Sequence, residues 1–294
     1  MKYDWIHQMR GSYRLERLCS ALAVSRSGYY KHCRRSVSAR ECSDAALLVA
    51  IRTIAERHHY RYGSPRMTAT LRQQGERCSL NRVARLMSLH GLGARRKKRY
   101  RITTRQDRTA IASPNRLGQC FKIDKINRIW LTDITYIDTD EGWLFLTVVL
   151  DLASRRIVGW AMNTTLEQHG VLQAMSQALG RRKPSTALTI HSDRGSQYTS
   201  NAFRNLLNEN SVTQSMSGTG NCYDNAPMES FFGTLKDELV HRCHYANREQ
   251  ARQSIVDYIE LYYNSERIHS ALNYQTPIEW ERQKIININN KKGL

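Results

Sequence analysis

Three closely spaced runs rich in β-branched and aromatic residues constrain the fold of this chain most. They cover residues 128–138, 143–151 and 155–162, and their connections include the short turn Asp140-Glu141-Gly142. Such runs and turns are typical of antiparallel strands. Helical and strand periodicity then alternate over residues 165–179, 187–191, 200–208, 212–216, 227–242 and 247–264. This order predicts a mixed five-stranded α/β sheet with helices on its faces.

The first part of the chain instead predicts short helices. Residues 12–35 have helical spacing on either side of a tight turn near Ser25-Arg26-Ser27-Gly28, and residues 44–58 form an amphipathic helix with Asp44 as its expected cap. The pattern indicates an all-α region before the sheet.

A helix-turn-helix unit is predicted within this region. Gly63-Ser64-Pro65 begins a helix that Gly75 ends, and Ser79 caps a second helix that reaches Gly91. Two short helices around a turn are typical of DNA-binding units, and a small structural bundle fits the same pattern. The second helix exposes Asn81, Arg82 and Arg85.

The distribution of charge favours the DNA-binding interpretation. Residues 1–122 hold 27 basic and 7 acidic residues, a net +20, whereas residues 123–294 hold 18 basic and 19 acidic, a net −1. A basic region beside a nearly neutral domain indicates contact with a polyanion. A basic run follows the second helix directly and consists of Arg95, Arg96, Lys97, Lys98 and Arg99.

These patterns divide the chain into five expected segments. They are an N-terminal helical segment (1–43), a helix-turn-helix DNA-binding domain (44–100), a linker (101–122), a catalytic domain (123–281) and a flexible tail (282–294). The seven cysteines are scattered without a C-x-x-C pair, as in a reduced cytosolic protein, and no zinc-finger spacing is present. The longest near-apolar stretch, 143–153, is too short to cross a bilayer, so we expect no membrane partner.

Two aspartates occupy positions that are unusual for a carboxylate. Asp133 lies inside the strand pattern Ile129-Trp130-Leu131-Thr132-Asp133-Ile134-Thr135-Tyr136, and Asp193 follows the strand at 187–191. A carboxylate inside a strand is costly unless something positive satisfies it, and the carboxyl ends of strands are where α/β sheets place their sites. For Asp133 the alternative is a structural role, with hydrogen bonds to backbone or an Arg partner. For Asp193 the alternative is a helix or turn cap.

Glu229 and Lys236 share one face of a predicted helix that opens at Asn225-Ala226-Pro227. Glu229 lies in the first turn and points away from the apolar stripe, and Lys236 follows two turns later. Three oxygen ligands from separate elements suit Mg²⁺ or Mn²⁺. Two such ions about 3.5–4 Å apart catalyse phosphoryl transfer, and Lys236 is positioned to hold a phosphate of the DNA. An exposed helix lysine is the other interpretation.

The contexts of Asp133, Asp193 and Glu229 resemble those of DDE transposases. They are Trp-Leu-Thr-Asp-Ile-Thr-Tyr, His-Ser-Asp-Arg-Gly-Ser-Gln-Tyr and Asn-Ala-Pro-Met-Glu-Ser-Phe-Phe-Gly-Thr-Leu-Lys, with 35 residues between the second and third carboxylates. The closer resemblance, over residues 45–280, is to the OrfB protein of the insertion sequence three family. It includes the late motif Tyr262-Tyr263-Asn264-Ser265-Glu266-Arg267-Ile268-His269-Ser270-Ala271-Leu272, in which Ile268 replaces a frequent Pro.

The resemblance implies a retroviral-integrase-like, ribonuclease-H-like core in which Asp133, Asp193 and Glu229 hold two Mg²⁺ or Mn²⁺ ions. It also implies cleavage at the terminal inverted repeats of the element and transfer of the 3′-hydroxyl strand into target DNA. A homo-oligomer on DNA, an upstream-frame OrfA partner or fusion, and a cytoplasmic, nucleoid-associated location in bacteria follow from the same resemblance.

Two other classes of function stay open at this point. One is a DNA-binding regulator with an inactive core, against which the intact carboxylates and Lys236 argue. The other is an RNA–DNA hybrid nuclease, which has no need of a helix-turn-helix. Asp151 is a decoy carboxylate that we expect to anchor a turn to Arg155 or Arg156, and Arg267 with His269 has packing and ion pairing as an alternative role.

Overall fold

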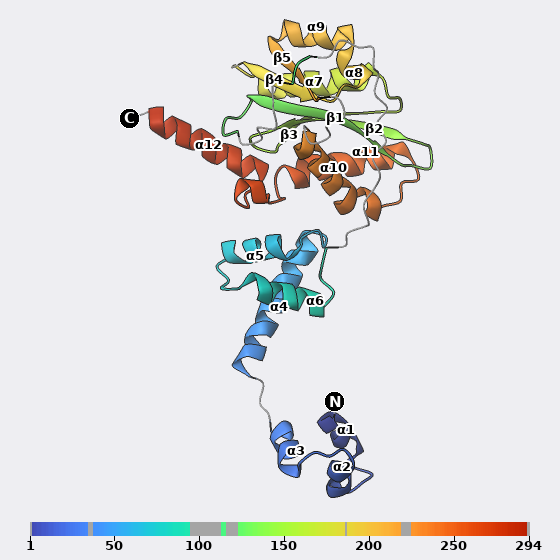
Figure 1. The fold of residues 1–294 in the computed structure, drawn as a ribbon, viewed down its shortest axis with the longest axis vertical. Helices are drawn as coiled ribbons and strands as arrows, with labels where there is room; N and C mark the ends of the chain where they lie inside the picture. The colour runs from blue at the N-terminus through green and yellow to red at the C-terminus, as the bar shows by residue number, and fades with distance from the viewer. Residues whose placement is uncertain are drawn as a thin grey trace.

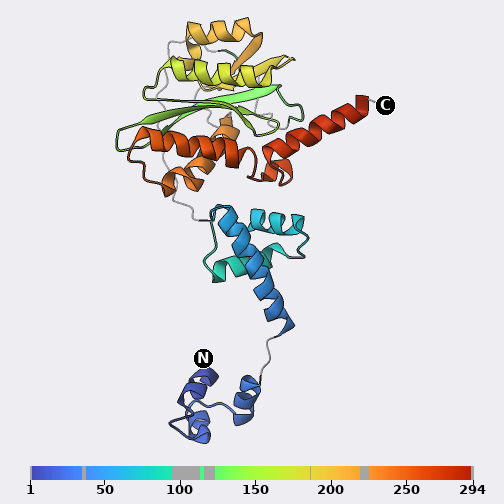
Figure 2. The same ribbon diagram turned by 180° about the vertical axis from the view of Figure 1, so that it is seen from behind.

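The computed structural model describes residues 2–34, 38–94, 113–115, 123–185, 187–218 and 225–292. Figures 1 and 2 show three tiers along the long axis: a small helical unit at the N-terminus, a second helical unit, and an α/β domain. The predicted basic run at 95–99 and nearly all of the predicted linker lie outside the described residues. Of the linker, Ser113 donates a hydrogen bond from Oγ to Oε1 of Gln214 at 3.2 Å, which ties this point to the sheet.

The α/β domain contains one sheet with the strand order β3-β2-β1-β4-β5. Neighbours β1, β2 and β3 are antiparallel, and β1, β4 and β5 are parallel, which confirms the predicted mixed five-stranded sheet. The strands are β1 (Ile129–Ile137), β2 (Leu144–Asp151), β3 (Ile157–Asn163), β4 (Leu188–Ser192) and β5 (Val212–Met216).

Helices cover both faces of this sheet (Figure 1). On one face, buried side chains such as Trp130 and Ile190 pack with α7 (Gln168–Arg182), α8 (Ser196–Thr199) and α9 (Asn201–Glu209). On the other face, Leu131 and Leu146 pack with α10 (Ala226–Glu238), α11 (Arg248–Asp257) and the π-helix η3 (Tyr258–Tyr263). Because side chains alternate along a strand, Asp133 shares the face of Leu131, toward α10.

The second helical unit consists of α4 (Ala39–Arg57), α5 (Ser64–Gln73) and α6 (Leu80–Leu89). The predicted ends of α5 and α6 are confirmed: Gly75 has φ +92°, and Ser79 accepts a hydrogen bond from the Arg82 amide. The predicted cap of α4 is wrong. Ser38 caps this helix through a reciprocal capping box with Glu41, and Asp44 lies inside it.

The N-terminal unit consists of α1 (Lys2–Met9), α2 (Leu15–Ala21) and α3 (Arg26–Cys33). The two predicted helices within residues 12–35 are confirmed, but the turn lies at residues 22–25, before Arg26, and α1 was not predicted. Ile6, Leu18, Cys19 and Tyr29 form a small core of their own. Only Ile6 of α1 is buried, so its periodicity in the sequence is weak.

The C-terminal residues form α12 (Pro277–Lys292), preceded by the short 3₁₀ helices η2 (Val240–Arg242) and η4 (Ser270–Leu272). The structure therefore continues as a helix to Lys292, where a frayed tail was expected from residue 282. Glu281 anchors α12 because it accepts hydrogen bonds from Arg156 and Arg182. Among the described residues, no helix combines the length and apolarity needed to cross a membrane.

Candidate active site and DNA-binding surfaces

Asp133 lies on β1, and Asp193 directly follows the adjacent parallel strand β4. The β1–β4 register pairs Leu131 with His191, so each aspartate stands two residues further along its chain. Asp133 accepts a hydrogen bond from the Ile134 amide at 2.7 Å, and Asp193 accepts one from the Gly195 amide at 3.0 Å. The predicted position of Asp193 at the carboxyl end of a strand is confirmed.

The electrostatics of Asp133 show that the carboxylates act on one another. Burial, together with the charges of Asp193 and Glu229, raises the pKa of Asp133 to about 8, while the hydrogen bond from the Ile134 amide and the charge of Lys236 oppose the shift. Burial also raises the pKa of Asp193. Mutual repulsion between carboxylates disfavours ionisation, which is the signature of an anionic cluster that a cation would stabilise.

Glu229 occupies the first turn of α10, as predicted, and is exposed. Its pKa is raised by partial burial. Within the part of the chain described, no three Asp, Glu, His or Cys side chains gather closely enough to enclose a metal ion. Glu229 thus belongs to the electrostatic neighbourhood of Asp133 without forming a closed cluster. The donor set fits Mg²⁺ or Mn²⁺, because all three groups are hard carboxylate oxygens and the Asp133 charge needs compensation.

Lys236 is half-buried and does not lie free on the helix surface. Its Nζ lies 4.8 Å from the centroid of the Tyr136 ring, a cation–π geometry. Burial lowers the pKa of Lys236, while Tyr136 and Asp133 oppose that shift. Sequence reasoning missed Tyr136, because an aromatic residue near the end of a strand pattern has no signal that separates it from the core. Lys236 therefore connects α10 electrostatically to the Asp133 neighbourhood.

Asp151, the decoy carboxylate, has a structural role with different partners from those predicted. It is fully buried and accepts hydrogen bonds from the amides of Asn127, Ala153 and Ser154 and from the indole of Trp130. The expected partners Arg155 and Arg156 do not hold it. Arg156 instead pairs with Glu281, because backbone donors already satisfy the carboxylate.

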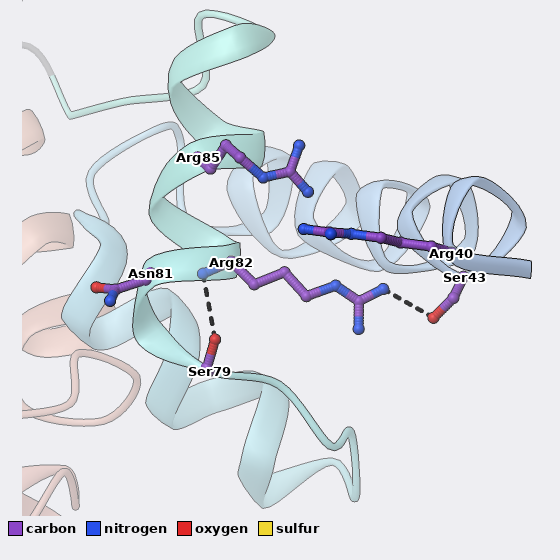
Figure 3. A pocket seen from close by; sticks show the side chains of 6 residues that line it. All are labelled: Arg40, Ser43, Ser79, Asn81, Arg82 and Arg85. Atoms are coloured by element: carbon purple, nitrogen blue, oxygen red, sulfur yellow. Dashed lines mark hydrogen bonds between the residues drawn. The ribbon is translucent and has the colours of Figure 1, made fainter. Parts of the chain in front are cut away.

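Arg82 and Arg85 both reach Asp44 on α4. Arg82 Nε lies 2.6 Å from Asp44 Oδ1, and Arg85 binds the second oxygen. These pairs lower the pKa of Asp44, chiefly through Arg85. Figure 3 shows the surface hollow beside them, where α4 and the N-terminus of α6 meet. The hollow is lined by Arg40, Ser43, Ser79, Asn81, Arg82 and Arg85.

The late motif contributes to a buried network of ion pairs around Glu238. Arg267, 2% exposed, donates to Glu238 from Nε at 2.9 Å and from Nη2 at 2.8 Å. Tyr258 also donates to this carboxylate at 2.9 Å. Arg267 Nη1 lies 3.2 Å from Nε2 of His269, whose pKa is lowered by burial and by Arg267. Ion pairing and packing are therefore the roles that the structure gives Arg267 and His269.

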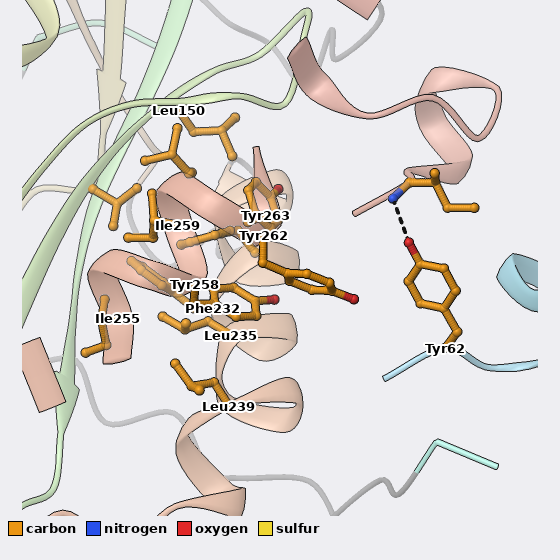
Figure 4. Packing of buried hydrophobic residues seen from close by; sticks show 14 of the residues in the cluster. Tyr62, Leu150, Phe232, Leu235, Leu239, Ile255, Tyr258, Ile259, Tyr262 and Tyr263 are labelled. Carbon is orange, nitrogen blue, oxygen red and sulfur yellow. Dashed lines mark hydrogen bonds between the residues drawn. The ribbon is translucent and has the colours of Figure 1, made fainter. Parts of the chain in front are cut away.

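The helix-turn-helix unit contacts the same part of the α/β domain (Figure 4). The Tyr62 hydroxyl accepts a hydrogen bond from the Ile268 amide at 3.1 Å and donates one to the Glu266 carbonyl at 3.2 Å. Arg66 donates to the Ile268 carbonyl at 3.1 Å. Arg61 lies 4.4 Å from the Tyr262 ring centroid. Sequence reasoning missed this contact, because residues so far apart in the chain leave no local pattern.

Comparison with known proteins identifies the chain. The integrase core domain family matches residues 124–222 and again 229–285, and the HTH-like domain family matches residues 42–100. A transposase of insertion sequence element IS904 from Lactococcus lactis is 40% identical over 249 residues, 84% of this chain and 98% of that protein. The transposase InsF for insertion sequence IS3A from Escherichia coli is 36% identical over 291 residues, 97% of this chain and 100% of that protein.

Among solved structures, the catalytic core of BIV integrase aligns at 18% identity with a TM-score of 0.41, over 56% of this chain and 99% of that one. The assignment rests on the sequence relatives and not on this alignment. An integrase core preceded by a helix-turn-helix defines a DDE-type polynucleotidyl transferase. More narrowly, the chain belongs to the transposases of bacterial insertion sequences, in the IS3 family.

Proposed function

We propose that this transposase binds the terminal inverted repeats of its element, cleaves them, and joins the 3′-hydroxyl strand to target DNA at Asp133, Asp193 and Glu229. The observation that carries the proposal is the position of Asp133 on β1 beside Asp193, which directly follows the adjacent parallel strand β4. Burial and the neighbouring carboxylates raise the pKa of Asp133 to about 8. Sites that concentrate negative charge in this way are suited to binding cations.

Two Mg²⁺ or Mn²⁺ ions held by the three carboxylates would activate the attacking oxygen and stabilise the leaving oxygen of phosphoryl transfer. The Ile134 and Gly195 amides orient Asp133 and Asp193 by hydrogen bonds. Lys236, fixed over Tyr136, holds a phosphate of the bound strand at the mouth of this site. A positioned charge of this kind aligns the phosphate for in-line attack.

The helix-turn-helix domain, which we place at residues 44–100, binds the DNA. Arg40, Arg82 and Arg85 line one hollow, and Asp44 pairs with Arg82 and Arg85 beside it, so the basic hollow is suited to a phosphate of the DNA backbone. The basic residues 95–99 extend the same charge along the sequence. Assembly of several copies on DNA and cooperation with an upstream-frame OrfA product belong to this proposal.

The direct test is strand transfer by the full chain in Mg²⁺, with Asp133→Asn, Asp193→Asn and Glu229→Gln. Each change removes a charged ligand with little change of volume, so we expect cleavage and transfer to be lost and DNA binding to be retained. Asp138→Asn is the matched control, because Asp138 is an exposed carboxylate just after the same strand. Activity of any triad variant within tenfold of wild type would remove that residue from the site.

The same assay separates the alternatives. A DNA-binding regulator with an inactive core would bind the element end and give neither cleavage nor transfer in the wild-type protein. A hybrid nuclease would instead degrade the RNA strand of an RNA–DNA duplex faster than it cuts element ends.

A further inference from the structure

The structure assigns a second DNA-binding module to residues 2–34, in which α3 enters a major groove of duplex DNA. This goes beyond the proposed function, which gives DNA binding to residues 44–100. Neither of the matched families reaches these residues, since the HTH-like match begins at residue 42.

The connection between α2 and α3 has the length of a helix-turn-helix turn. Four residues, 22–25, join the helices, and the unit places Ser25 as the cap of α3, where its side chain accepts a hydrogen bond from the Gly28 amide at 3.0 Å. Ala23 has φ +52°, the left-handed conformation that closes such a turn. By contrast, α5 and α6 are joined by six residues, 74–79. The N-terminal unit therefore has the shorter, tighter turn that DNA-binding units use.

Helix α1 packs behind this pair and fixes it. Tyr29 and Ile6 are almost fully buried against one another's helices, and Lys2 donates to the Leu22 carbonyl at 2.9 Å. A Cβ on Gly28 would lie 2.3 Å from the Tyr3 hydroxyl, so glycine at this position lets α1 and α3 approach closely. The outward face of α3 is left uncovered by this packing.

That outward face has the composition of a DNA-contacting helix. Five exposed residues of α3 and its C-cap follow the spacing i, i+1, i+4, i+5 and i+8 and lie along one side of the helix, next to the exposed Cys33: Arg26, Ser27, Tyr30, Lys31 and Arg34. Arginine, lysine, serine and tyrosine contact base edges and phosphates. Arg26 pairs with Glu16, but both side chains are over 60% exposed, so the pair is weak and open to exchange for a phosphate.

The charge of the unit favours DNA over a protein partner. Residues 2–34 contain seven basic and two acidic residues, and both acids are engaged, Asp4 with His32 and Glu16 with Arg26. Exposed Arg14 and Arg17 lie on or beside α2, the helix that crosses the phosphate backbone when a helix-turn-helix docks. The cores of protein interfaces are depleted in charge, which this face is not.

The test uses the full chain on a duplex that contains the terminal repeat of the element encoding it, and on an unrelated duplex of equal length. For Arg26→Ala/Lys31→Ala we expect affinity to fall about tenfold and the log–log salt slope to become shallower by about 1.8, since each lost phosphate contact contributes about 0.9. Protection of one segment of the terminal repeat from hydroxyl radicals should also disappear. Lys125→Ala/Lys183→Ala, with the same loss of charge on the α/β domain, is the matched control and should leave the segment protected.

A second pair of variants separates this inference from the proposed function. Arg82→Ala/Arg85→Ala should remove protection of a different segment. If that segment stays protected, the proposed DNA contact of α6 is wrong, and the inference about α3 is unaffected. The inference is overturned if Arg26→Ala/Lys31→Ala keeps wild-type affinity, slope and protection. It is equally overturned if the variant changes the oligomeric state in sedimentation while the slope stays the same, because α3 would then be a protein interface.

Discussion

The hydroxyl of Tyr62, in the helix-turn-helix unit, accepts a hydrogen bond from the amide of Ile268, in the late motif of the α/β domain, at 3.1 Å. The same hydroxyl donates to a carbonyl of that motif, so one side chain satisfies two backbone groups of the other domain. The late motif is therefore the part of the α/β domain on which the helix-turn-helix unit packs. The ion pairs of Glu238 with Arg66 and Arg267 stabilise this contact between the helix-turn-helix unit and the α/β domain.

We expect Tyr62→Phe to lower the free energy of unfolding by about 1–2 kcal/mol, because it leaves the Ile268 amide and the Glu266 carbonyl without their partner. The ring keeps its stack on His58, with centroids 4.0 Å apart. Urea titration measures the loss. Tyr60→Phe, at an exposed ring in the same loop, is the control and should change little.

Glu238→Gln should be much more damaging, at about 3–5 kcal/mol. The change leaves the guanidinium of Arg267 buried without its counter-ion and weakens the nearby pair with Arg66. Asp237→Asn is the matched control, since that partly exposed neighbour pairs only loosely with His241, at 3.7 Å. Equal stability of the two variants would show that the Arg267–Glu238 pair does not stabilise the late motif.

Acid should loosen the same contact through His58. Burial, assisted by Arg57, lowers the pKa of His58 to about 4, below its usual value near 6.5. Between these values the unfolded chain binds more protons than the folded one, so stability falls as the pH drops from about 6.5 toward 4. His58→Phe removes this contribution. We expect the wild type to lose more stability than His58→Phe between pH 7 and pH 5 in urea titrations, and parallel curves would contradict the assignment.

Asp44→Ala should strengthen DNA binding. Removing Asp44 frees Arg82 and Arg85 and deletes a negative charge from the hollow on α4 and α6. The expected result is a several-fold gain in affinity for duplex DNA and a steeper salt slope by about 0.9 or more. Glu56→Ala, an exposed acid on the same helix, is the control. If both variants gain equally, net charge and not the release of the two arginines is responsible.

Local patterns predicted the parts of the fold that depend on neighbours in sequence. The runs rich in β-branched and aromatic residues located β1, β2 and β3. Gly75 marked the end of α5, and Ser79 marked the start of α6. The cap of α4 was misplaced because the capping box at Ser38 lies before the apolar periodicity begins, while Asp44 has the right residue type but lies six residues too late. A capping signal needs the residue three positions on, here Glu41, to be decisive.

Contacts between distant segments were beyond any local pattern. Nothing in the spacing of Glu238 and Arg267 states that Arg66 shares their network, because tertiary pairing depends on how three separate elements pack. Asp133 stood out in the sequence for the opposite reason, because a carboxylate conflicts with the apolar strand around it. Its place in a functional site stays a prediction.

Substitution of Lys236 tests whether this side chain holds a phosphate or is an ordinary helix lysine. Its Nζ lies over the Tyr136 ring and is close enough to Asp133 to act on its pKa, so truncation removes a charge from the site itself. We expect Lys236→Ala to spare folding and bulk DNA affinity, yet to lower strand transfer at saturating DNA by about tenfold or more, since one misplaced phosphate disturbs the in-line geometry. Lys236→Arg should recover part of the rate by restoring charge without the same point geometry. Lys284→Ala is the matched control, because Lys284 also lies over an aromatic ring, that of Trp280 at 5.0 Å, but on α12. Equal transfer rates for wild type and Lys236→Ala would leave Lys236 with a packing role against Tyr136 only.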